Sequence, residues 1–588
     1  MTETVIDVLA RTASAHSARP AMRVKRGGAW QTTSWGEYKD QAFLAARGFM
    51  RLGHEPGQAV LIMGFSRPEW FLSDVGAIAA GGMPAGIYTT STPEQCRFIA
   101  EHAAAPVAVL QNEEYLARFR AIRDRLPALE AIVLMEGDAT EEGVYSWARL
   151  LELGAEVPEG DLRRRIDGQK PHDVCTLIYT SGTTGEPKAV MLTHENLVWT
   201  AQAVIEAFRL HADDTFISYL ALSHISEQMV SLHCPMGCGG CTWFAESLEK
   251  LAANLREIRP HLFFAVPRVW EKLQAAMEAA GARNSPLKKK LVAWARRRGL
   301  EGGRADQRGT PRPLLYGLAN KLVFSKVRQR LGFDRTRVCG SGAAALSTDT
   351  QQFFLSLGIP IYNIYGLSET TAPATWNLPG AFREGTAGRP VPGTEVRLAE
   401  DGEVLIRGPQ VFSGYYRNEA ATREVLDPDR WFHTGDIGSF DADGFLSITD
   451  RKKELLVTSG GKNIAPAPIE ARLQRIPAVA QAVVVGDGRN YVAALLALDP
   501  ERVADEAAAA GSPARDVAAA SCCPTFRAYL GRQVEKVNAE LARHETIKRF
   551  VILPGELTVD GDELTPTMKV KRRVIARKYA AQIEELYD

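Results

Sequence analysis

The chain has 588 residues, of which 45% are hydrophobic and 24% are charged, so it can form two or more domains with large cores. Its 70 Lys and Arg residues balance 70 Asp and Glu residues, which excludes a global attraction to nucleic acid or to an anionic membrane. The first residues contain no basic segment followed by an apolar one, and no apolar run reaches the ~18 residues of a spanning helix. We therefore expect a cytoplasmic protein.

Eight cysteines in a chain of this length do not indicate a disulfide framework. Cys234, Cys238 and Cys241 lie beside His233 with the spacing of radical enzymes that hold an iron–sulfur cluster through three thiolates. The alternative is a Gly-rich apolar turn in which the cysteines pack as small hydrophobic side chains. We favour the apolar turn, because the rest of the chain predicts a different fold.

Helical patterns and short apolar strands alternate along the first part of the chain, which is typical of α/β layering. A helix is predicted at residues 35–52, a strand at 59–63 and another helix from Pro68. Further strands are predicted at residues 106–110, 174–178, 216–220, 261–266 and 336–339. From about Thr386 the pattern changes to short strands and turns, which predicts a smaller β subdomain. The strands of that subdomain are expected at residues 396–398, 402–407 and 444–448.

The tail mixes strands at residues 483–485 and 492–498 with Ala-rich helices, which is typical of a separate small α+β domain. We therefore predict a large N-terminal domain over residues 1–450, built from layered α/β subdomains and the β subdomain. A small α+β C-terminal domain is predicted over residues 451–588.

Residues 283–330 carry fourteen Lys and Arg residues and only two acidic ones. Hydrophobic residues are interleaved with them: Leu287, Leu291, Trp294, Leu314, Leu315, Tyr316, Leu322, Val323 and Phe324. This composition fits a solvated helical hairpin on the protein surface. It also fits a basic amphipathic patch that docks on anionic lipid headgroups, on the inner face of a membrane. Nucleic acid is a weaker choice, because no reading motif accompanies the charge.

The segment Tyr179-Thr180-Ser181-Gly182-Thr183-Thr184-Gly185-Glu186-Pro187-Lys188 follows an apolar strand. Its glycines let the backbone approach an anion, its hydroxyl and amide groups donate hydrogen bonds, and its lysine supplies positive charge. A Walker loop needs Lys directly after the second glycine, whereas Glu186 and Pro187 follow Gly185 here. The segment therefore predicts a triphosphate site without a Walker helix.

Four more polar motifs follow in order. An aromatic residue and then a hydroxyl and carboxylate pair, in Tyr365-Gly366-Leu367-Ser368-Glu369-Thr370, can offer a stacking face for a base and a ligand for Mg²⁺. The others are Thr434-Gly435-Asp436, the charged run Asp450-Arg451-Lys452-Lys453-Glu454 with the later Ser459-Gly460-Gly461-Lys462-Asn463, and Pro566-Thr567-Met568-Lys569-Val570-Lys571. Each alone fits an ordinary turn or a solvated charge run, but their joint occurrence in this order does not.

With these motifs the chain resembles the adenylate-forming superfamily of acyl-CoA synthetases, carrier-protein adenylation domains and luciferases, over nearly its full length. Within it, Val266-Pro267-Arg268-Val269-Trp270-Glu271-Lys272, the basic insert and the Pro566 to Lys569 ending resemble long-chain acyl-CoA synthetases of the bubblegum branch. That ending lacks the Ser-Gly that precedes the catalytic lysine in many relatives, which leaves Lys569 and Lys571 both open. The order of the motif favours Lys569.

The resemblance implies an α/β fold with a mobile C-terminal domain, and ATP, Mg²⁺ and coenzyme A as cofactors. It implies that Glu369 binds Mg²⁺ with Thr184 or Thr370 nearby, and that Tyr365 stacks on adenine beside the backbone of residues 341–344. It also implies that Asp436 accepts hydrogen bonds from the ribose, as a carboxylate can, and that Arg451 reaches the ribose or the phosphates. The nucleotide-binding residues that the resemblance implies are Thr180, Ser181, Gly182, Thr183, Thr184, Gly185, Lys188, Gly342, Ala343, Tyr365, Gly366, Thr370, Asp436 and Arg451.

The resemblance further implies that Lys569 bridges the acid and the α-phosphate during adenylation. The C-terminal domain would then turn about residues 450–453 and bring Gly460 and Gly461 to the acyl-adenylate, where they leave a narrow slot for a pantetheine arm. His224 is expected near the acyl carboxyl, with an ordinary structural histidine as the alternative. The acyl pocket is expected among residues 225–230, 339–346 and 266–270.

The sequence thus predicts a long-chain fatty acid–CoA ligase that forms acyl-AMP and pyrophosphate, then acyl-CoA and AMP, with fatty acid, ATP and CoA as its partners. One alternative is a fatty acyl-AMP ligase that loads a carrier protein. Another is a medium-chain or aryl acid–CoA ligase, and a third is a catalytically inactive, lipid-associated scaffold. Chain length, pathway and oligomeric state are not determined by the sequence.

Overall fold

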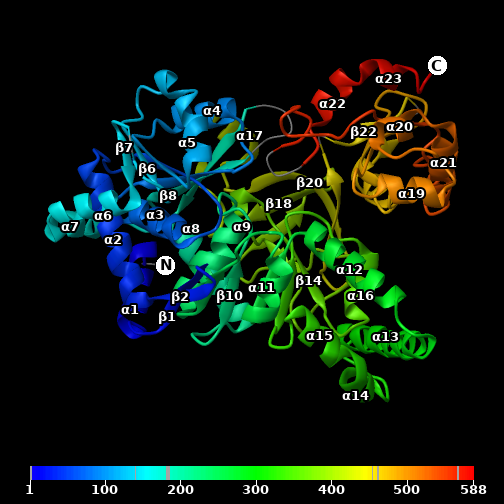
Figure 1. Ribbon diagram of the computed structural model, residues 1–588, viewed down its shortest axis with the longest axis horizontal. Helices are drawn as coiled ribbons and strands as arrows, with labels where there is room; N and C mark the ends of the chain where they lie inside the picture. Colours follow the sequence, from blue (N-terminus) through cyan, green and yellow to red (C-terminus); the bar gives the residue numbers. More distant parts are fainter. Residues whose placement is uncertain (1–2, 140, 181–185, 453, 460–461, 566–568) are drawn as a thin grey trace.

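The computed structural model describes residues 3–139, 141–180, 186–452, 454–459, 462–565 and 569–588. Figure 1 shows a large layered α/β part and, at the upper right, a smaller part formed by the end of the chain. The predicted sites Ser181, Gly182, Thr183, Thr184, Gly185, Gly460 and Gly461 lie outside the described residues.

An eight-stranded sheet forms the first layer of the large part, in the order β19-β9-β8-β4-β3-β5-β6-β7. Its strands are β3 (Ala59–Met63), β4 (Met83–Ile87), β5 (Val107–Leu110), β6 (Ala131–Leu134), β7 (Val144–Ser146), β8 (Val174–Thr180), β9 (Lys188–Thr193) and β19 (Gly414–Tyr415). Every residue of β3 and β5 is buried, as expected for parallel strands covered on both faces. The helices of this layer are α2 (Trp35–Arg51), α3 (Pro68–Ala79), α4 (Pro93–Ala103), α5 (Glu113–Arg120), α6 (Trp147–Glu156), α7 (Glu159–Asp167) and α8 (His194–Phe208).

Two further sheets complete the α/β layers, in the orders β12-β13-β14-β15-β16 and β10-β11-β1-β2. Their strands are β1 (Pro20–Arg26), β2 (Ala29–Ser34), β10 (Thr215–Ser218), β11 (Cys241–Phe244), β12 (Leu262–Ala265), β13 (Val338–Ser341), β14 (Ile361–Tyr365), β15 (Thr375–Trp376) and β16 (Arg389–Pro390). The helices around them are α1 (Val5–Ala15), α9 (Ile225–Gln228), the π-helical turn η2 (Met229–His233), α10 (Cys234–Cys238), α11 (Leu251–Ile258), α12 (Pro267–Ala282) and α16 (Thr348–Leu355). These elements match the predicted alternation of strands and helices.

The cysteine cluster lies on two elements. Cys234 and Cys238 belong to α10, whereas Cys241 begins β11. Cys234 packs in the main hydrophobic core, and burial raises the pKa of the Cys238 and Cys241 thiols to about 12. These thiols therefore pack as apolar side chains, as the sequence favoured.

A four-stranded antiparallel sheet, β17-β18-β20-β21, forms the predicted β subdomain. Its strands are β17 (Glu395–Leu398), β18 (Glu403–Arg407), β20 (Phe432–Phe440) and β21 (Leu446–Arg451), and α17 (Glu419–Val425) precedes β20. Residue Arg451 still pairs with Asp436 in this sheet, so the ladder continues to the start of the predicted hinge.

The end of the chain folds around the three-stranded sheet β24-β25-β26 with its own buried core. Its elements are β22 (Leu456–Val457), β23 (Asn463–Ile464), β24 (Val479–Val485), β25 (Ala493–Leu498), β26 (Phe550–Ile552), α18 (Pro466–Leu473), α19 (Val503–Ala509), α20 (Val517–Cys522), α21 (Pro524–Asn538), α22 (Arg572–Lys578) and α23 (Ala580–Glu584). Arg475 in this part forms an exposed ion pair with Asp349 of α16, with 2.9 Å between Nη1 and Oδ2.

The basic segment is helical and projects at the lower right of Figure 1, as α13 (Pro286–Gln307), α14 (Tyr316–Ala319), the π-helical turn η3 (Asn320–Phe324) and α15 (Ser325–Leu331). A small core of its own holds it together, made by Ala295, Ala319, Val323 and Phe324. The described helices include none that is both long and apolar enough to cross a membrane.

Asp74 of α3 is a buried carboxyl group within the main core. It is 1% exposed, and neither of its oxygens has a hydrogen-bond partner among the described residues. Burial raises its pKa to about 8, so it is protonated in the folded protein at neutral pH. In the unfolded chain such a carboxyl titrates near pH ~3.9. Between these pH values the folded state therefore holds a proton that the unfolded state has lost, and stability falls as the pH rises.

We predict that Asp74→Asn raises the melting temperature at pH 7.5 and has a smaller effect at pH 5. The wild-type free energy of unfolding should fall by up to about 1.4 kcal/mol for each pH unit, a loss that the amide avoids. Thermal unfolding followed by circular dichroism at the two pH values measures this. Asp40→Asn, whose native side chain is 74% exposed, is the control. An equal shift for Asp74→Asn at both pH values would contradict the assignment.

Candidate active site

The candidate site lies where β8, β13 and β14 end, beside the first strands of the β subdomain. Thr180 ends β8 and pairs with Lys188, which begins β9, and its hydroxyl donates to the Lys188 carbonyl oxygen at 3.3 Å. The predicted phosphate loop therefore connects two antiparallel strands, and a strand follows it instead of a Walker helix. Carboxyl ends of strands in open α/β sheets are the usual place for ligands.

Lys188, Tyr415 and Glu369 form a connected group beside this loop. The Lys188 ammonium lies 4.8 Å from the centre of the Tyr415 ring, and the Tyr415 hydroxyl donates to Glu369 Oε1 at 2.8 Å. Burial and the Glu369 charge raise the pKa of Tyr415, so its hydroxyl keeps its proton. Tyr415 was not predicted as a site residue. It belongs to no motif and joins the site only because β19 pairs with β9.

Asp436 connects Tyr365 and Arg451 through both of its carboxylate oxygens. The Tyr365 hydroxyl donates to Oδ2 at 2.7 Å, and Arg451 Nε lies 3.0 Å from Oδ1. Burial, together with the Asp436 charge, raises the pKa of Tyr365 well above its usual value. Partial burial would lower the pKa of Arg451, but the carboxylates of Asp436, Glu454 and Glu369 raise it. Three residues predicted separately are thus in direct contact.

The turns that carry these residues need their glycines and hydroxyls. A Cβ on Gly366 would lie 1.5 Å from the Ala372 carbonyl oxygen, so no other residue fits there. Gly435 adopts a φ of +72°, which disfavours side chains, and its N–H donates to Glu403 Oε1 at 2.8 Å. Lys452 Nζ lies 3.0 Å from the other oxygen of Glu403, which ties the chain after β21 to β18.

Thr370, predicted to lie near a metal ion, follows Glu369 directly and bonds within its own turn. It is fully buried, and its hydroxyl accepts a hydrogen bond from the Leu367 N–H at 2.9 Å. The same hydroxyl lies 3.1 Å from the Ala372 carbonyl oxygen. Thr370 therefore holds the turn that carries Glu369, because its oxygen is satisfied within that turn.

Lys569 reaches this group from the end of the chain. The residue is exposed, yet desolvation by the surrounding protein and the Arg451 charge lower its pKa, while Asp436, Glu454 and Glu369 oppose this. Lys571 instead forms an ion pair with Asp562, on the C-terminal part itself. Of the two lysines that the sequence left open, the structure brings Lys569 to the site.

His224 lies close enough to Lys569 for the lysine charge to affect its imidazole. Burial and the Lys569 charge lower the pKa of His224 to about 4, so its imidazole is neutral near pH 7. Its Nδ1 accepts a hydrogen bond from the Ser226 N–H at 3.2 Å and thereby caps α9. His224 thus has a structural contact, and it also lies beside the predicted catalytic lysine.

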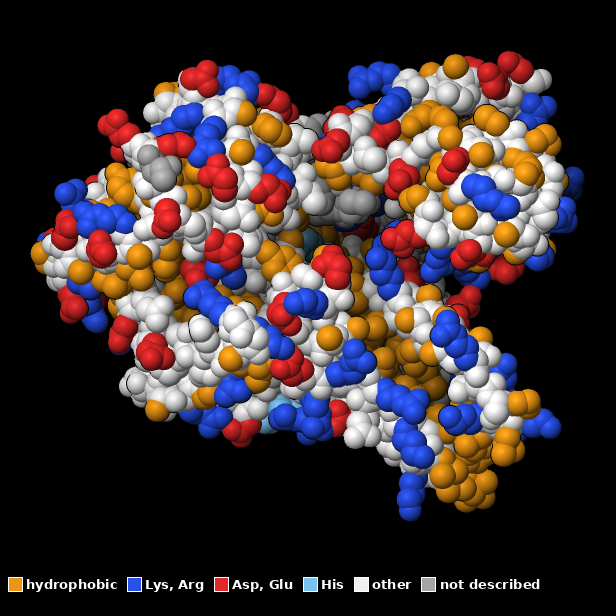
Figure 2. Space-filling model, viewed as in Figure 1, with side chains coloured by type: hydrophobic (Ala, Val, Ile, Leu, Met, Phe, Trp, Pro, Cys, Tyr) orange, Lys and Arg blue, Asp and Glu red, His pale blue; other side chains and the backbone are white. Residues whose placement is uncertain are grey.

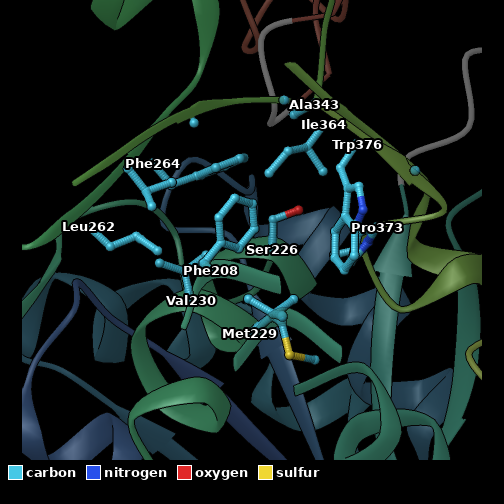
Figure 3. A pocket seen from close by; sticks show the side chains of 16 residues that line it. Phe208, Ser226, Met229, Val230, Leu262, Phe264, Ala343, Ile364, Pro373 and Trp376 are labelled. Carbon is cyan, nitrogen blue, oxygen red and sulfur yellow. The ribbon is translucent and has the colours of Figure 1, made fainter. Parts of the chain in front are cut away.

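An apolar cavity, partly open to solvent, lies beside these polar groups (Figure 3). Gly342, Ala343 and Gly366 line its end near Tyr365, and Phe208, Phe264 and Trp376 line its sides. The other lining residues are Val204, Ser226, Met229, Val230, Leu262, Val338, Gly340, Ile364, Ala372 and Pro373. The cavity meets the polar group at the Gly342–Ala343 turn, where Ala343 has a φ of +67°.

The acyl pocket expected from the sequence agrees with this cavity only in part. Residues of the predicted ranges 225–230 and 339–346 line it, but none from 266–270 does. Trp270 is instead fully buried in another core and donates to the Gly340 carbonyl oxygen at 3.2 Å. The side walls from α8 and β15, with Phe208 and Trp376, were missed because their apolar residues carry no motif.

Comparison with known proteins agrees with this geometry. The AMP-binding enzyme family model matches residues 9–416, and the model of the AMP-binding enzyme C-terminal domain matches residues 453–588. The chain belongs to the AMP-binding enzyme family. The long-chain-fatty-acid–CoA ligase ACSBG2 of Xenopus laevis is 40% identical over 100% of this chain and 84% of its own length. The ligase ACSBG1 of Mus musculus is 37% identical over 97% of this chain and 83% of its own.

Solved structures of adenylate-forming enzymes share the fold. The anthranilate CoA ligase AuaEII in complex with anthranoyl-AMP has a TM-score of 0.74 at 21% identity, over 100% of this chain and 98% of its own. The A-PCP didomain of the carboxylic acid reductase from Segniliparus rugosus in complex with AMP has a TM-score of 0.75 at 19% identity. That match covers 99% of this chain and 82% of the didomain. These structures confirm the predicted fold class, and the family models and curated relatives confirm the predicted family.

The residues present fit a magnesium ion that is shared with a nucleotide. Mg²⁺ in such sites takes one or two carboxylates and completes its shell with phosphate oxygens and water. Glu369 offers such a carboxylate, because Tyr415 occupies only Oε1 and the described residues donate no hydrogen bond to Oε2. Glu369 would therefore hold the ion, which supplies charge neutralisation to the phosphates when bound. Thr184, the second predicted ligand, lies outside the described residues.

We predict that Tyr415→Phe lowers kcat/KM for ATP about tenfold, because Glu369 loses a hydrogen bond of the kind that charged groups make, worth ~1.5–3 kcal/mol. Acid-dependent release of pyrophosphate at varied ATP and Mg²⁺ concentrations measures this. Tyr416→Phe is the matched control, since that ring packs on His102 instead. Unchanged ATP and Mg²⁺ dependence in Tyr415→Phe would refute the role of this contact.

Proposed function

We propose that this chain is an AMP-forming long-chain fatty acid–CoA ligase. The observation that carries the proposal is the joint position of an apolar cavity and a group of ATP-type contacts, with Lys569 at their junction. The shared name of the ACSBG relatives, which match the whole chain at 36–40% identity, supports the same acid and the same acceptor. The cavity lining supports an aliphatic substrate, because its side walls are aromatic and branched aliphatic side chains.

In the first step a carboxylate oxygen of the acid attacks the α-phosphorus of ATP. The bond from that phosphorus to the oxygen that bridges to the β-phosphate breaks, and pyrophosphate leaves with the electron pair. We assign Thr180, Lys188 and the loop between them to the β- and γ-phosphates, and Asp436 and Arg451 to the ribose. Catalysis then consists mainly of positioning and charge neutralisation.

Lys569 and His224 are assigned to the reacting carboxyl. The Lys569 ammonium donates to the acid and to an α-phosphate oxygen, which offsets the repulsion between two anions. His224, neutral because its pKa is lowered to about 4, can hydrogen-bond the carboxyl without adding a charge. Its hydrogen bond with the Ser226 N–H fixes the ring.

In the second step the sulfur of coenzyme A attacks the acyl carbon. The bond from that carbon to the phosphate oxygen breaks, AMP leaves, and the thioester is the product. We propose that residues 451–588 act as a mobile domain that turns about residues 450–453, removes Lys569 and brings Gly460 and Gly461 to the adenylate. Burial raises the pKa of Asp450 in this hinge to about 6. The exposed Arg475–Asp349 pair is a contact that such a turn would break.

A fatty acyl-AMP ligase that loads a carrier protein is the main alternative, and a medium-chain or aryl acid–CoA ligase is another. Formation of thioester with free coenzyme A, without any carrier protein, would exclude the first. A panel of acids from short to very long chains, with aryl acids, assayed for CoA-dependent AMP formation, separates the second from the proposal.

We predict that Lys569→Ala slows acyl-AMP formation from ATP by about a hundredfold or more, while thioester formation from preformed acyl-AMP stays within a few-fold of wild type. Removal of one preorganised charged donor typically costs 10²–10³-fold in such a step. Pyrophosphate release measures the first reaction, and acyl-CoA formation from synthetic acyl-AMP measures the second. Lys571→Ala is the control. Equal loss in both steps would refute the assignment of Lys569.

We further propose that the protein is cytoplasmic and contacts the inner face of a membrane peripherally through residues 283–330. Six of the eight exposed large hydrophobic side chains among the described residues lie in this segment, including Leu287, Leu314 and Leu315 at 79%, 89% and 57% exposure. Figure 2 shows an apolar patch at the lower right, in the region where this segment projects, with basic side chains beside it.

Charge complementarity supports an anionic lipid surface as the partner. Lys288, Lys289 and Lys290 are exposed between Leu287 and Leu291, so basic and apolar side chains lie close together at the start of α13. Inserted leucines gain ~1.5–3 kcal/mol each, and each basic residue near an anionic surface adds ~1 kcal/mol. A ligase placed in this way would meet fatty acids where they partition.

We predict that replacing Leu314, Leu315 and Leu318 together by Ser reduces co-sedimentation with phosphatidylglycerol-containing vesicles by about tenfold or more. Changing Lys288, Lys289 and Lys290 to Glu should reduce it similarly at low salt and less at high salt. Leu248→Ser, which alters an equally exposed leucine elsewhere, should leave binding unchanged. Unchanged binding in both multiple variants would rule out this surface, and CoA ligation of a soluble medium-chain acid reports that they are folded.

A further inference from the structure

A second cavity lies beyond the apolar cavity along the same pair of helical segments. It lies between α1, α8 and the η2–α10 segment and is partly open to solvent. Its lining consists of Glu3, Val5, Val8, Arg11, Leu197, Val198, Ala201, Gln202, Ile205, His233, Met236 and Gly237. Both cavities are thus lined by α8 and by the helical run from α9 to α10.

The spacing of the lining residues places the cavities one after the other. On α8, Val204 and Phe208 line the first cavity, and Leu197 and Ala201 line the second. These four residues are spaced by three or four positions, so they lie on one stripe of the helix. On the helical run from α9 to α10, Met229 lines the first cavity and His233, four positions later, lines the second.

The wall between the cavities is therefore about one helical turn thick, and its side chains are those of Ala201, Val204, Met229 and His233. One turn corresponds to roughly 5.4 Å along the axis. Met229 is an unbranched side chain with several rotatable bonds, so it can change rotamer without moving the backbone. Ala201 on the opposite side is small and leaves room there.

The chemistry of the second cavity suits an aliphatic chain. Val5, Val8, Leu197 and Ile205 form its walls, while the Glu3–Arg11 pair lies half exposed at its rim. The one buried polar side chain is His233, which is 4% exposed and whose Nε2 has no hydrogen-bond partner among the described residues. Burial and the neighbouring His194 lower the pKa of His233 to about 3, so it brings no charge into the cavity at neutral pH.

We propose that the second cavity is the binding site for the distal end of a long acyl chain, and that Met229 and Ala201 set the chain length that is accepted. The carboxyl group lies at the Lys569 end of the first cavity, and the chain passes Met229 into the space between α1 and α8. Shorter chains end before this wall and use the first cavity alone. This inference rests on the proposed function and adds its chain-length determinant.

The first test fills the second cavity with Ala201→Phe. Each methylene kept from burial costs ~0.8 kcal/mol, or about fourfold in kcat/KM. We expect kcat/KM for octadecanoic acid to fall at least tenfold, while kcat/KM for decanoic acid stays within about twofold of wild type. Glu206→Phe, which places the same ring on an exposed position of α8, is the matched control and should leave the ratio of the two acids unchanged.

A second variant changes the chain-length preference in the opposite direction. The test therefore does not depend on whether Ala201→Phe, which adds a large side chain, folds. Met229→Ala shortens the wall and should raise the preference for octadecanoic over decanoic acid by several-fold. An unchanged ratio in both Ala201→Phe and Met229→Ala would overturn the chain-length assignment. Failure of the proposed function appears separately, as wild-type protein that forms no acyl-CoA from any acid.

Discussion

Asp436 joins three elements that meet at the start of the hinge. It lies on β20, accepts the Tyr365 hydroxyl from the end of β14, and pairs with Arg451 at the end of β21. The α/β layers and the β subdomain are thus connected at a buried carboxylate, beside the point where the chain leaves for its C-terminal part. Arg451 and Asp436 also shift the pKa of Lys569, so this group interacts electrostatically with the C-terminal part of the chain. The fold, the proposed nucleotide site and the proposed hinge therefore depend on one another here.

Much of this arrangement could be predicted from the sequence because it depends on local patterns. The strand that leads to Thr180, the Gly366 turn and the Thr434-Gly435-Asp436 turn each need particular residue types, and such turns leave motifs. The family resemblance then ordered these motifs, and the family matches confirmed it. The Thr370 hydroxyl, predicted to lie near the metal ion, also bonds within its own turn, and the motif alone does not indicate that second role.

What the sequence could not supply depends on contacts between distant elements. Tyr415 meets Glu369 only because β19 pairs with β9, and no local pattern specifies that pairing. Apolar cavities are equally hidden, since Phe208 and Trp376 resemble any other core residues until their helix and strand are placed together. Buried groups such as Asp74 and His233 gain their shifted pKa values from the same tertiary surroundings.

The ion pair between Arg475 and Asp349 has a consequence for the rate of the reaction cycle. Its side chains are 42% and 62% exposed, and exposed pairs typically contribute only ~0–1 kcal/mol. Breaking it therefore adds less than about tenfold to the time needed for release. A contact of this strength can orient the C-terminal part over the proposed adenylation site without locking it there. If that part turns in each cycle as proposed, breaking this ion pair does not make its release the slowest step.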